Sequence, residues 1–209
     1  MVRQRVRIRF RKQGDLRLVG HRDLVRSMER LFRRAGLRLG MSEGFHPKPR
    51  MSFPSALAVG IEGLDEVMEL ELAEPYTREE LLRRLSSQAL PGLAFQSIEP
   101  LPPGTRKAQL KSAVYRVAIP AARRADVADR TARLLAQSSC PITRPGKPGV
   151  IDVRLFLEEL TLRDGVLAMR LSTSRRQSAG PRDVLEVLGL RDLDEQGAHL
   201  TRTTVELDE

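Results

Sequence analysis

The chain has 209 residues, a length typical of one large domain or of two small ones. Hydrophobic residues make up 41% and charged residues 30% of the chain, which argues against disorder as its main state. No apolar stretch approaches the ~18 residues that span a bilayer. Arginines interrupt the N-terminal apolar residues, so we expect no signal peptide and no membrane contact, and we expect a cytoplasmic location.

Cysteine and histidine are scarce in this chain. The single cysteine, Cys140, excludes an internal disulfide, a four-cysteine zinc site and an iron–sulfur cluster held by several cysteines. The three histidines, His21, His46 and His199, contain no pair at helical spacing. We therefore expect this chain to bind no metal and no cofactor by itself.

The net charge of +9 is unevenly distributed. Residues 1–54 hold 15 Lys and Arg against 4 Asp and Glu, whereas residues 55–209 hold 21 against 23. Such asymmetry is typical of a protein with a polyanionic partner, most often nucleic acid. The alternative is an arginine-rich composition whose extra arginines are merely solvated.

Strand and helix patterns alternate in the first half of the chain. Residues 2–10 alternate apolar and polar side chains, which predicts a strand that is buried on one face. Residues 22–35 carry an apolar helical stripe that ends at Gly36. The elements expected next are a Gly- and Pro-rich loop at 40–54, a short strand at 56–61, a strand at 66–73, a helix at 77–88 with Thr77 and Glu80 as its capping box, and a strand at 93–99.

A proline-rich break at 100–104 precedes a second series of elements. They are a strand at 114–119, a helix at 121–138, a strand at 150–157, a turn and strand within 160–173, a helix from Pro181 to Leu188 and a strand at 199–207. Both halves thus follow the order β-α-β-β-α-β. We predict an α+β fold of two tandem ferredoxin-like modules, 1–99 and 112–209, joined by a linker at 100–111. Each module is expected to have an antiparallel sheet covered by two helices.

The first predicted strand places its arginines on the face opposite its apolar residues. These arginines are Arg3, Arg5, Arg7, Arg9 and Arg11. Glu69 and Glu71 of the strand expected beside it lie on the same face, so cross-strand ion pairs are expected to cancel much of this charge. The face also lacks the aromatic residues on which RNA-recognition domains stack bases.

The first helix carries a second basic surface. Arg22, Arg26, Arg30 and Arg33 form one stripe opposite the apolar stripe. Such a stripe can follow a phosphate backbone, and it can equally be a solvated helix face.

The loop at 40–54 presents cations and aromatics together. Its tip holds Phe45, His46, Lys48 and Arg50, and Phe53 follows. Loops of this length are often functional, and the alternative is a covering loop whose phenylalanines close the core. We predict nucleic-acid binding by this loop.

Catalytic residues are hard to assign. His21 and His46 are the only candidates for acid–base chemistry, and a histidine in the position of His21 more often helps to cap a helix. The chain has no Walker phosphate loop, no G-x-G-x-x-G, no G-x-S-x-G and no Cys-x-x-Cys motif. The sequence therefore does not indicate a self-sufficient enzyme.

Several short segments together resemble a known bacterial family. They are 12–17 (KQGDLR), 20–24 (GHRDL), 44–53 (GFHPKPRMSF), 151–154, 180–185 and 202–203. In this pattern the chain is similar to the radical SAM-associated (radical SAM-linked) family of unknown function. Gly20 and His46 stand where that family usually has serine and asparagine. The resemblance implies a radical SAM protein as partner.

Charge and resemblance together lead to one hypothesis with two alternatives. The hypothesis is a non-catalytic accessory protein that binds tRNA or rRNA and presents it to a radical SAM enzyme. Its predicted RNA contacts are Arg22, Arg26, Arg30, Arg33, Phe45, His46, Lys48 and Arg50. The alternatives are a metal-independent RNA endonuclease of the tandem ferredoxin-like type and a pure protein–protein adaptor.

Overall fold

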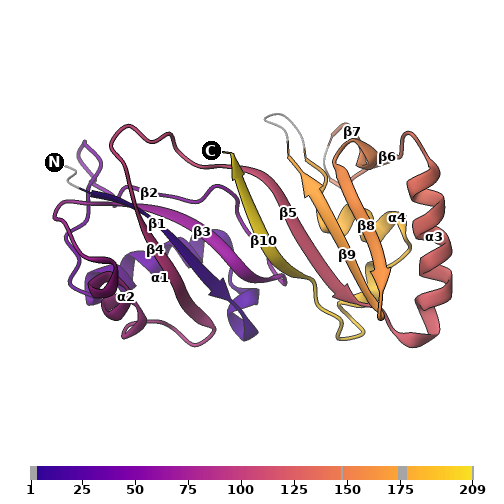
Figure 1. The fold of residues 1–209 in the computed structure, drawn as a ribbon, viewed down its shortest axis with the longest axis horizontal. Helices are drawn as coiled ribbons and strands as arrows, with labels where there is room; N and C mark the ends of the chain where they lie inside the picture. Colours follow the sequence, from indigo (N-terminus) through magenta and orange to yellow (C-terminus); the bar gives the residue numbers. More distant parts are fainter. Residues whose placement is uncertain (1–3, 147, 174–177, 209) are drawn as a thin grey trace. The chain divides into compact units, whose positions relative to one another are not determined.

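The computed structural model describes residues 4–146, 148–173 and 178–208, so Val2 and Arg3 of the first predicted strand lie outside the described residues. The chain divides into two compact units, residues 1–109 with 207–209, and residues 110–206. Both units combine helices with antiparallel strands (Figure 1), which confirms the α+β class. No helix of the described residues is long and apolar enough to cross a membrane.

The first unit is built on three long strands. Its elements are β1 (Gln4–Lys12), a 3-10 turn (Gly14–Leu18), α1 (His21–Arg34), β2 (Met51–Ser52), β3 (Glu62–Leu72), α2 (Arg78–Ser86) and β4 (Leu93–Leu101). β1 lies between β4 and β3 and is antiparallel to both, with Ile8 opposite Ile98 and Met68. The short strand β2 pairs with β3.

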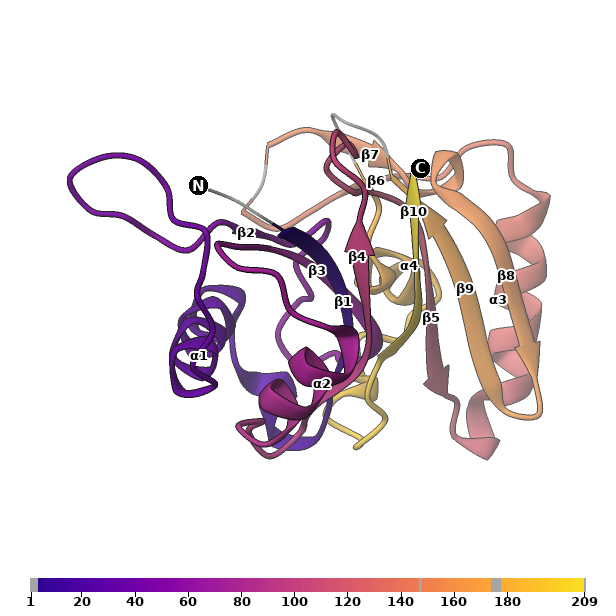
Figure 2. The same ribbon diagram turned by 60° about the vertical axis from the view of Figure 1, so that its left-hand side comes forward.

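The core of the first unit forms where the apolar face of the sheet meets the helices. Alternate residues of β1 are buried in it, and so are Met28 and Phe32 of α1. Figure 2 shows α1 and α2 on the same side of β1, β3 and β4. α2 begins as predicted, because the hydroxyl of Thr77 accepts a hydrogen bond from the backbone N–H of Glu80. The two periodicities read from the sequence are therefore confirmed in this unit.

The second unit contains a four-stranded antiparallel sheet. Its elements are β5 (Gln109–Ala118), α3 (Arg124–Ala136) after a 3-10 turn (Ala121–Arg123), β6 (Pro141–Thr143), β7 (Val150–Asp152), a 3-10 turn (Val153–Leu155), β8 (Leu157–Arg163), β9 (Val166–Ser172), α4 (Pro181–Val187), a 3-10 turn (Arg191–Leu193) and β10 (Thr201–Asp208). The strand order of the sheet is β10-β5-β9-β8. The β8–β9 hairpin turns at Asp164 and Gly165, which both have positive φ.

The short strand expected at 56–61 is wrong. Leu57 and Ile61 of this segment are buried, but the N–H of Ile61 bonds to the carbonyl of Ala58. Gly60 has a φ of +85° at this position. The apolar run therefore buries its side chains from a turn. The short strand in this part of the chain is instead β2, at the end of the predicted loop, which pairs with β3.

The single strand expected at 150–157 is also wrong. It divides into β7, the 3-10 turn Val153–Leu155 and β8. The Asp152 carboxylate accepts from the backbone N–H groups of Cys140 and Arg154 at 2.8 and 2.9 Å, which breaks the extended chain after β7. A hydrogen bond from the Ser139 hydroxyl, together with these two backbone hydrogen bonds, lowers the pKa of Asp152. β7 pairs with β6, a strand that the sequence did not predict.

The predicted linker at 100–111 contains the ends of two strands. β4 continues to Leu101 and β5 begins at Gln109. Between them the N–H of Thr105 bonds to the carbonyl of Pro102, so the segment turns sharply.

Gly92 offers a test of the packing before β4. Its φ is +82°, and an added Cβ lies 2.3 Å from the backbone oxygen of Gln13. Gly104 has a similar φ of +81°, but no atom lies within 4 Å of an added Cβ. A substitution at Gly104 therefore measures the backbone strain of a positive φ alone, without a steric contact. We expect Gly104→Ala to lower the free energy of unfolding by about 1–2 kcal/mol. Gly92→Ala should lower the free energy of unfolding by about 1–3 kcal/mol more than Gly104→Ala does, as measured by urea unfolding. Equal losses for the two variants would show that the chain moves away from the Gln13 oxygen at no cost.

Candidate nucleic-acid interface

Residues 41–50 form an arm that the first unit holds at its base. The N–H of Gly40 donates to the carbonyl of Glu71, and the N–H of Glu71 donates to the carbonyl of Arg50. Arg50 in turn donates its N–H to the carbonyl of Gly40 at 2.8 Å. Both ends of the arm are thus tied to β3, and Figure 2 shows the arm projecting clear of the sheet and of α1 and α2.

The tip of the arm is closed by two hydrogen bonds. The N–H of Ser42 donates to the carbonyl of Lys48 at 2.8 Å, and the Ser42 hydroxyl accepts from the N–H of Lys48 at 2.9 Å. Phe45, between them, is fully exposed, and His46 and Lys48 are exposed as well. A solvated phenylalanine gains none of the free energy that its burial in the core would give. The arm therefore displays an aromatic ring near one cation, Lys48, with Glu43 and His46 also exposed on it.

The two phenylalanines of the predicted loop have different roles. Phe53 packs against the core, with its ring 6.3 Å from that of Phe10. The His21 ring meets Phe53 edge-on at 5.1 Å and 90°. Phe53 therefore helps to close the core, as the alternative interpretation of this loop expects. Phe45 does not contribute to the core.

Neither candidate acid–base histidine is placed beside a carboxylate within the described part of the chain. His21 begins α1, and its ring packs on Phe53. The N-cap residue of the helix is Gly20, which has no side chain that could cap it. His46 stands exposed on the arm. No group of three or more His, Cys, Asp or Glu among the described residues is arranged to hold a metal ion.

The α1 stripe consists of Arg22, Arg26, Arg30 and Arg33, and all four side chains are exposed. Arg26 pairs with Asp23 at 3.2 Å, but both side chains are about two-thirds exposed, so the pair is weak. The other three arginines make no ion pair with any residue that the structure describes. The stripe therefore presents nearly its full positive charge to the solvent.

Arg5, Arg7 and Arg9 of β1, unlike most arginines of the α1 stripe, form ion pairs. Guanidinium nitrogens of Arg5 and Arg7 lie 2.5 and 3.3 Å from the carboxylate of Glu69, which is only 2% exposed. Arg9 pairs with Asp65 at 2.6 Å. The predicted neutralisation of this face by cross-strand ion pairs is confirmed at Glu69. The charges of Arg5, Arg7 and Arg9 are thus paired with carboxylates of β3 within the sheet.

A pocket of about 470 Å³ opens at the base of the arm. We call it the arm pocket, and its lining residues are Arg5, Ser42, Lys48, Pro49, Arg50, Met51, Ser52, Glu69, Glu71 and Lys107. Lys48 and Arg50 are among the predicted RNA contacts, whereas Lys107, which lies outside the basic first quarter of the chain, is not. The adjacent cations Arg106 and Lys107, just after the proline-rich break, were the one available signal.

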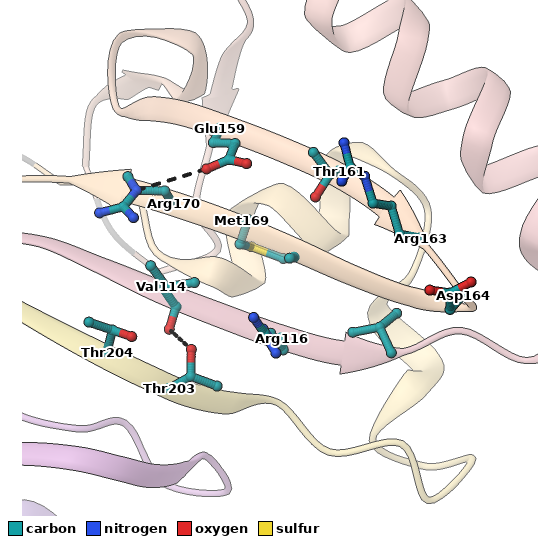
Figure 3. Close-up of a pocket in the computed structure, with 12 residues that line it drawn as sticks. Val114, Arg116, Glu159, Thr161, Arg163, Asp164, Met169, Arg170, Thr203 and Thr204 are labelled. Carbon is teal, nitrogen blue, oxygen red and sulfur yellow. Dashed lines mark hydrogen bonds and ion pairs between the residues drawn. The ribbon is translucent and has the colours of Figure 1, made fainter.

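A second pocket, of about 510 Å³, lies on one face of the sheet of the second unit (Figure 3). Arg170 lines it and donates to Glu206, and it also pairs with Glu159 at 4.0 Å. The bonds from Arg170 and from the Ser112 hydroxyl lower the pKa of Glu206. Arg170 is therefore neutralised by carboxylates, whereas Arg116 and Arg163, which also line this pocket, form no ion pair with any residue that the structure describes.

A family model described as "Uncharacterized protein conserved in bacteria (DUF2344)" matches residues 5–181. The chain belongs to this family. The match includes the α1 stripe and the arm, but the description names no activity and no radical SAM protein. The bacterial family of unknown function is thus confirmed, and its link to radical SAM proteins stays a prediction. No curated protein matches the chain.

Two solved structures show only a weak likeness. The "Crystal Structure of an Unknown Protein from Galdieria sulphuraria" is 12% identical, with 99% of each chain covered and a TM-score of 0.30. The "Crystal structure of putative glycine cleavage system transcriptional repressor" is 11% identical, with 99% of this chain and 98% of the other covered and a TM-score of 0.28. Likeness at this level supports no conclusion on fold or function.

Glu69→Gln tests the buried ion pairs beneath the arm pocket. Removing this charge leaves two largely buried guanidinium groups without their shared carboxylate, so we expect the free energy of unfolding to fall by about 3–5 kcal/mol. Asp23→Asn, in an exposed pair, should cost at most about 1 kcal/mol. Urea unfolding followed by circular dichroism measures both, and a small loss for Glu69→Gln would contradict this account.

Proposed function

We propose that this protein binds RNA and presents it to a radical SAM enzyme, without catalysing a reaction of its own. The observation on which the proposal rests is the fully exposed ring of Phe45, held among His46 and Lys48 at the tip of a tethered arm.

An exposed aromatic ring near a lysine suits a nucleic acid for two reasons. Every base offers a face that can stack on a phenyl ring, and this stacking contributes about 1–3 kcal/mol per base. The charge of Lys48, three residues from the ring, attracts the phosphates that flank the base. Because proteins recognise RNA mainly at unstacked bases, RNA is the better ligand for such an arm.

The α1 stripe supports the same function through the backbone of the RNA. Three of its arginines have no ion pair within the described residues, so they keep their charge for a partner. Residues along one helix face can contact successive phosphates without reading sequence. The stripe would thus supply general affinity, and the arm would supply contact with a particular nucleotide.

The strand orders support our further proposal that each unit is a ferredoxin-like module. In both units the first long strand lies between the last strand and the second strand of a β-β pair: β1 lies between β4 and β3, and β5 between β10 and β9. The β6–β7 ribbon is an addition to that pattern.

The radical SAM partner rests on the resemblance of the sequence motifs, and one of these, 44–53, includes the tip of the arm. The endonuclease alternative gains no support from the histidines, since His21 packs on Phe53 and His46 has no carboxylate beside it in the described residues. The adaptor alternative predicts that the same cations contact an acidic protein surface, and RNA binding separates it from our proposal.

The α1 stripe is tested by replacing Arg22, Arg26 and Arg30 with glutamine. Each lost phosphate contact lowers the slope of log affinity against log salt by about 0.7–0.9, so the triple variant should lose roughly 2. Affinity should fall for all RNAs alike. Glutamine is a good helix former, so folding should barely change. Titration of labelled RNA at several salt concentrations measures the slope.

The matched control for this variant carries three glutamines at other exposed arginines, Arg78, Arg83 and Arg133. It removes the same charge and should change the slope by much less. Equal slopes for wild type and the α1 stripe variant would mean that the stripe is only a solvated face. If wild type binds no RNA even at low salt, the adaptor function replaces the one proposed.

Phe45→Ala tests base stacking separately from charge. The ring is fully exposed, so the substitution should leave stability unchanged and should weaken RNA binding by about 1–3 kcal/mol with little effect on the salt slope. Leu18→Ala, at another exposed apolar side chain of the same unit, is the control and should leave affinity unchanged. Unchanged binding by Phe45→Ala would remove the stacking role.

A further inference from the structure

The arm pocket has more cations than its carboxylates neutralise. Four cationic side chains line it, and so do two carboxylates, Glu69 and Glu71. Glu69 is engaged by Arg5 and Arg7, and Glu71 lies 3.5 Å from a guanidinium nitrogen of Arg50. Glu43 also lies 3.6 Å from Arg50. All of these carboxylates are thus paired with arginines, and the two lysines of the pocket remain uncompensated.

Lys48 and Lys107 are both exposed, and neither forms an ion pair with any residue in the described ranges. They come from segments far apart in the sequence, the arm and the stretch after β4. A lysine ammonium is a compact charge that suits a phosphate oxygen. Two of them on one pocket, with the hydroxyls of Ser42 and Ser52 beside them, favour a phosphate group as ligand.

Arg5 holds the stretch that carries Lys107. Its guanidinium donates to the carbonyl of Thr105 at 2.5 Å and to that of Arg106 at 3.1 Å while it pairs with Glu69. The backbone next to Lys107 is therefore anchored to β1. The arm is anchored to β3, so both walls of the pocket are fixed to the same sheet.

We propose that the arm pocket binds a backbone phosphate of an unpaired RNA segment through Lys48 and Lys107, while a neighbouring base of that segment stacks on Phe45. This inference rests on the proposed RNA-binding function and names its substrate class, which is single-stranded RNA or an RNA loop.

The spacing of the two contacts agrees with this class. Phe45 and Lys48 are three residues apart, so their Cα atoms are at most about 11 Å apart. A few neighbouring nucleotides of one strand, at about 3.4 Å each when stacked, can cover a distance within this limit. Only an unpaired strand can supply both contacts, because a base inside a duplex is covered by its stacked neighbours. A duplex has no unpaired base for Phe45, so we expect it to bind through the α1 stripe.

The test compares a labelled 12-nucleotide single strand with a blunt 12-base-pair RNA duplex, both titrated with the full chain at several salt concentrations. Wild type should bind the single strand more tightly. The double variant Lys48→Gln with Lys107→Gln should lose at least about tenfold in affinity for the single strand. Its salt slope should fall by about 1.4, from two lost contacts of about 0.7 each. Duplex binding should stay within about twofold, because we expect a duplex to contact the α1 stripe rather than the arm.

Two further variants keep this test specific. The double variant Lys48→Arg with Lys107→Arg retains both charges and should restore most of the single-strand affinity. Arg78→Gln with Arg83→Gln removes the same charge from α2 and should leave the preference for the single strand intact. Thermal melting should show unchanged folding for all of them, since every substituted side chain is exposed.

The outcomes separate this inference from the function on which it rests. Equal wild-type affinity for the two RNAs, or an unchanged slope in the Lys48 and Lys107 variant, overturns the arm pocket as a phosphate site. RNA binding that persists in those cases and depends on the α1 stripe leaves the proposed function standing. If wild type binds neither RNA at low salt, both proposals fail.

Discussion

The shared ion pair of Glu69 with Arg5 and Arg7 is the constraint on which the first unit depends. The carboxylate is almost fully buried on β3, and both arginines lie on β1, so the pair joins the two strands across their polar face. Two buried guanidinium groups without this carboxylate would be strongly destabilising. Arg5 also binds the carbonyls of residues 105 and 106, so the same contact fixes the wall that carries Lys107.

This constraint divides the basic first quarter of the chain into two classes of cation. The arginines of β1 are held by carboxylates and contribute to the sheet, whereas the α1 stripe and Lys48 keep their charge for a partner. The net charge of +11 over residues 1–54 does not show which cations belong to which class. The strand register does, because Arg7 stands opposite Glu69 and its neighbour Arg5 reaches the same carboxylate.

Periodicity predicted the long elements, because apolar residues that repeat every two or every three to four positions must share one buried face. It failed at 56–61, where Gly60 permits a turn that buries Leu57 and Ile61 without a strand. The loop at 40–54 was recognised from its prolines and glycines, but composition cannot tell which phenylalanine is buried. Lys107 was missed because its place depends on hydrogen bonds from Arg5, one hundred residues earlier, to neighbouring carbonyls.

Stability does not account for Phe45. A ring of this size gains about 1.5–3 kcal/mol when it is buried, and Phe45 forgoes all of it, although Phe53 a few residues later packs against the core. The hydrogen bonds that close the arm tip come from Ser42 and the backbone, so the arm keeps its form without the ring. The Phe45 ring contributes nothing to the fold and is held away from it. Its burial can therefore release free energy only when a ligand covers it. The uncompensated charge of Lys48 on the same arm indicates that this ligand carries negative charge.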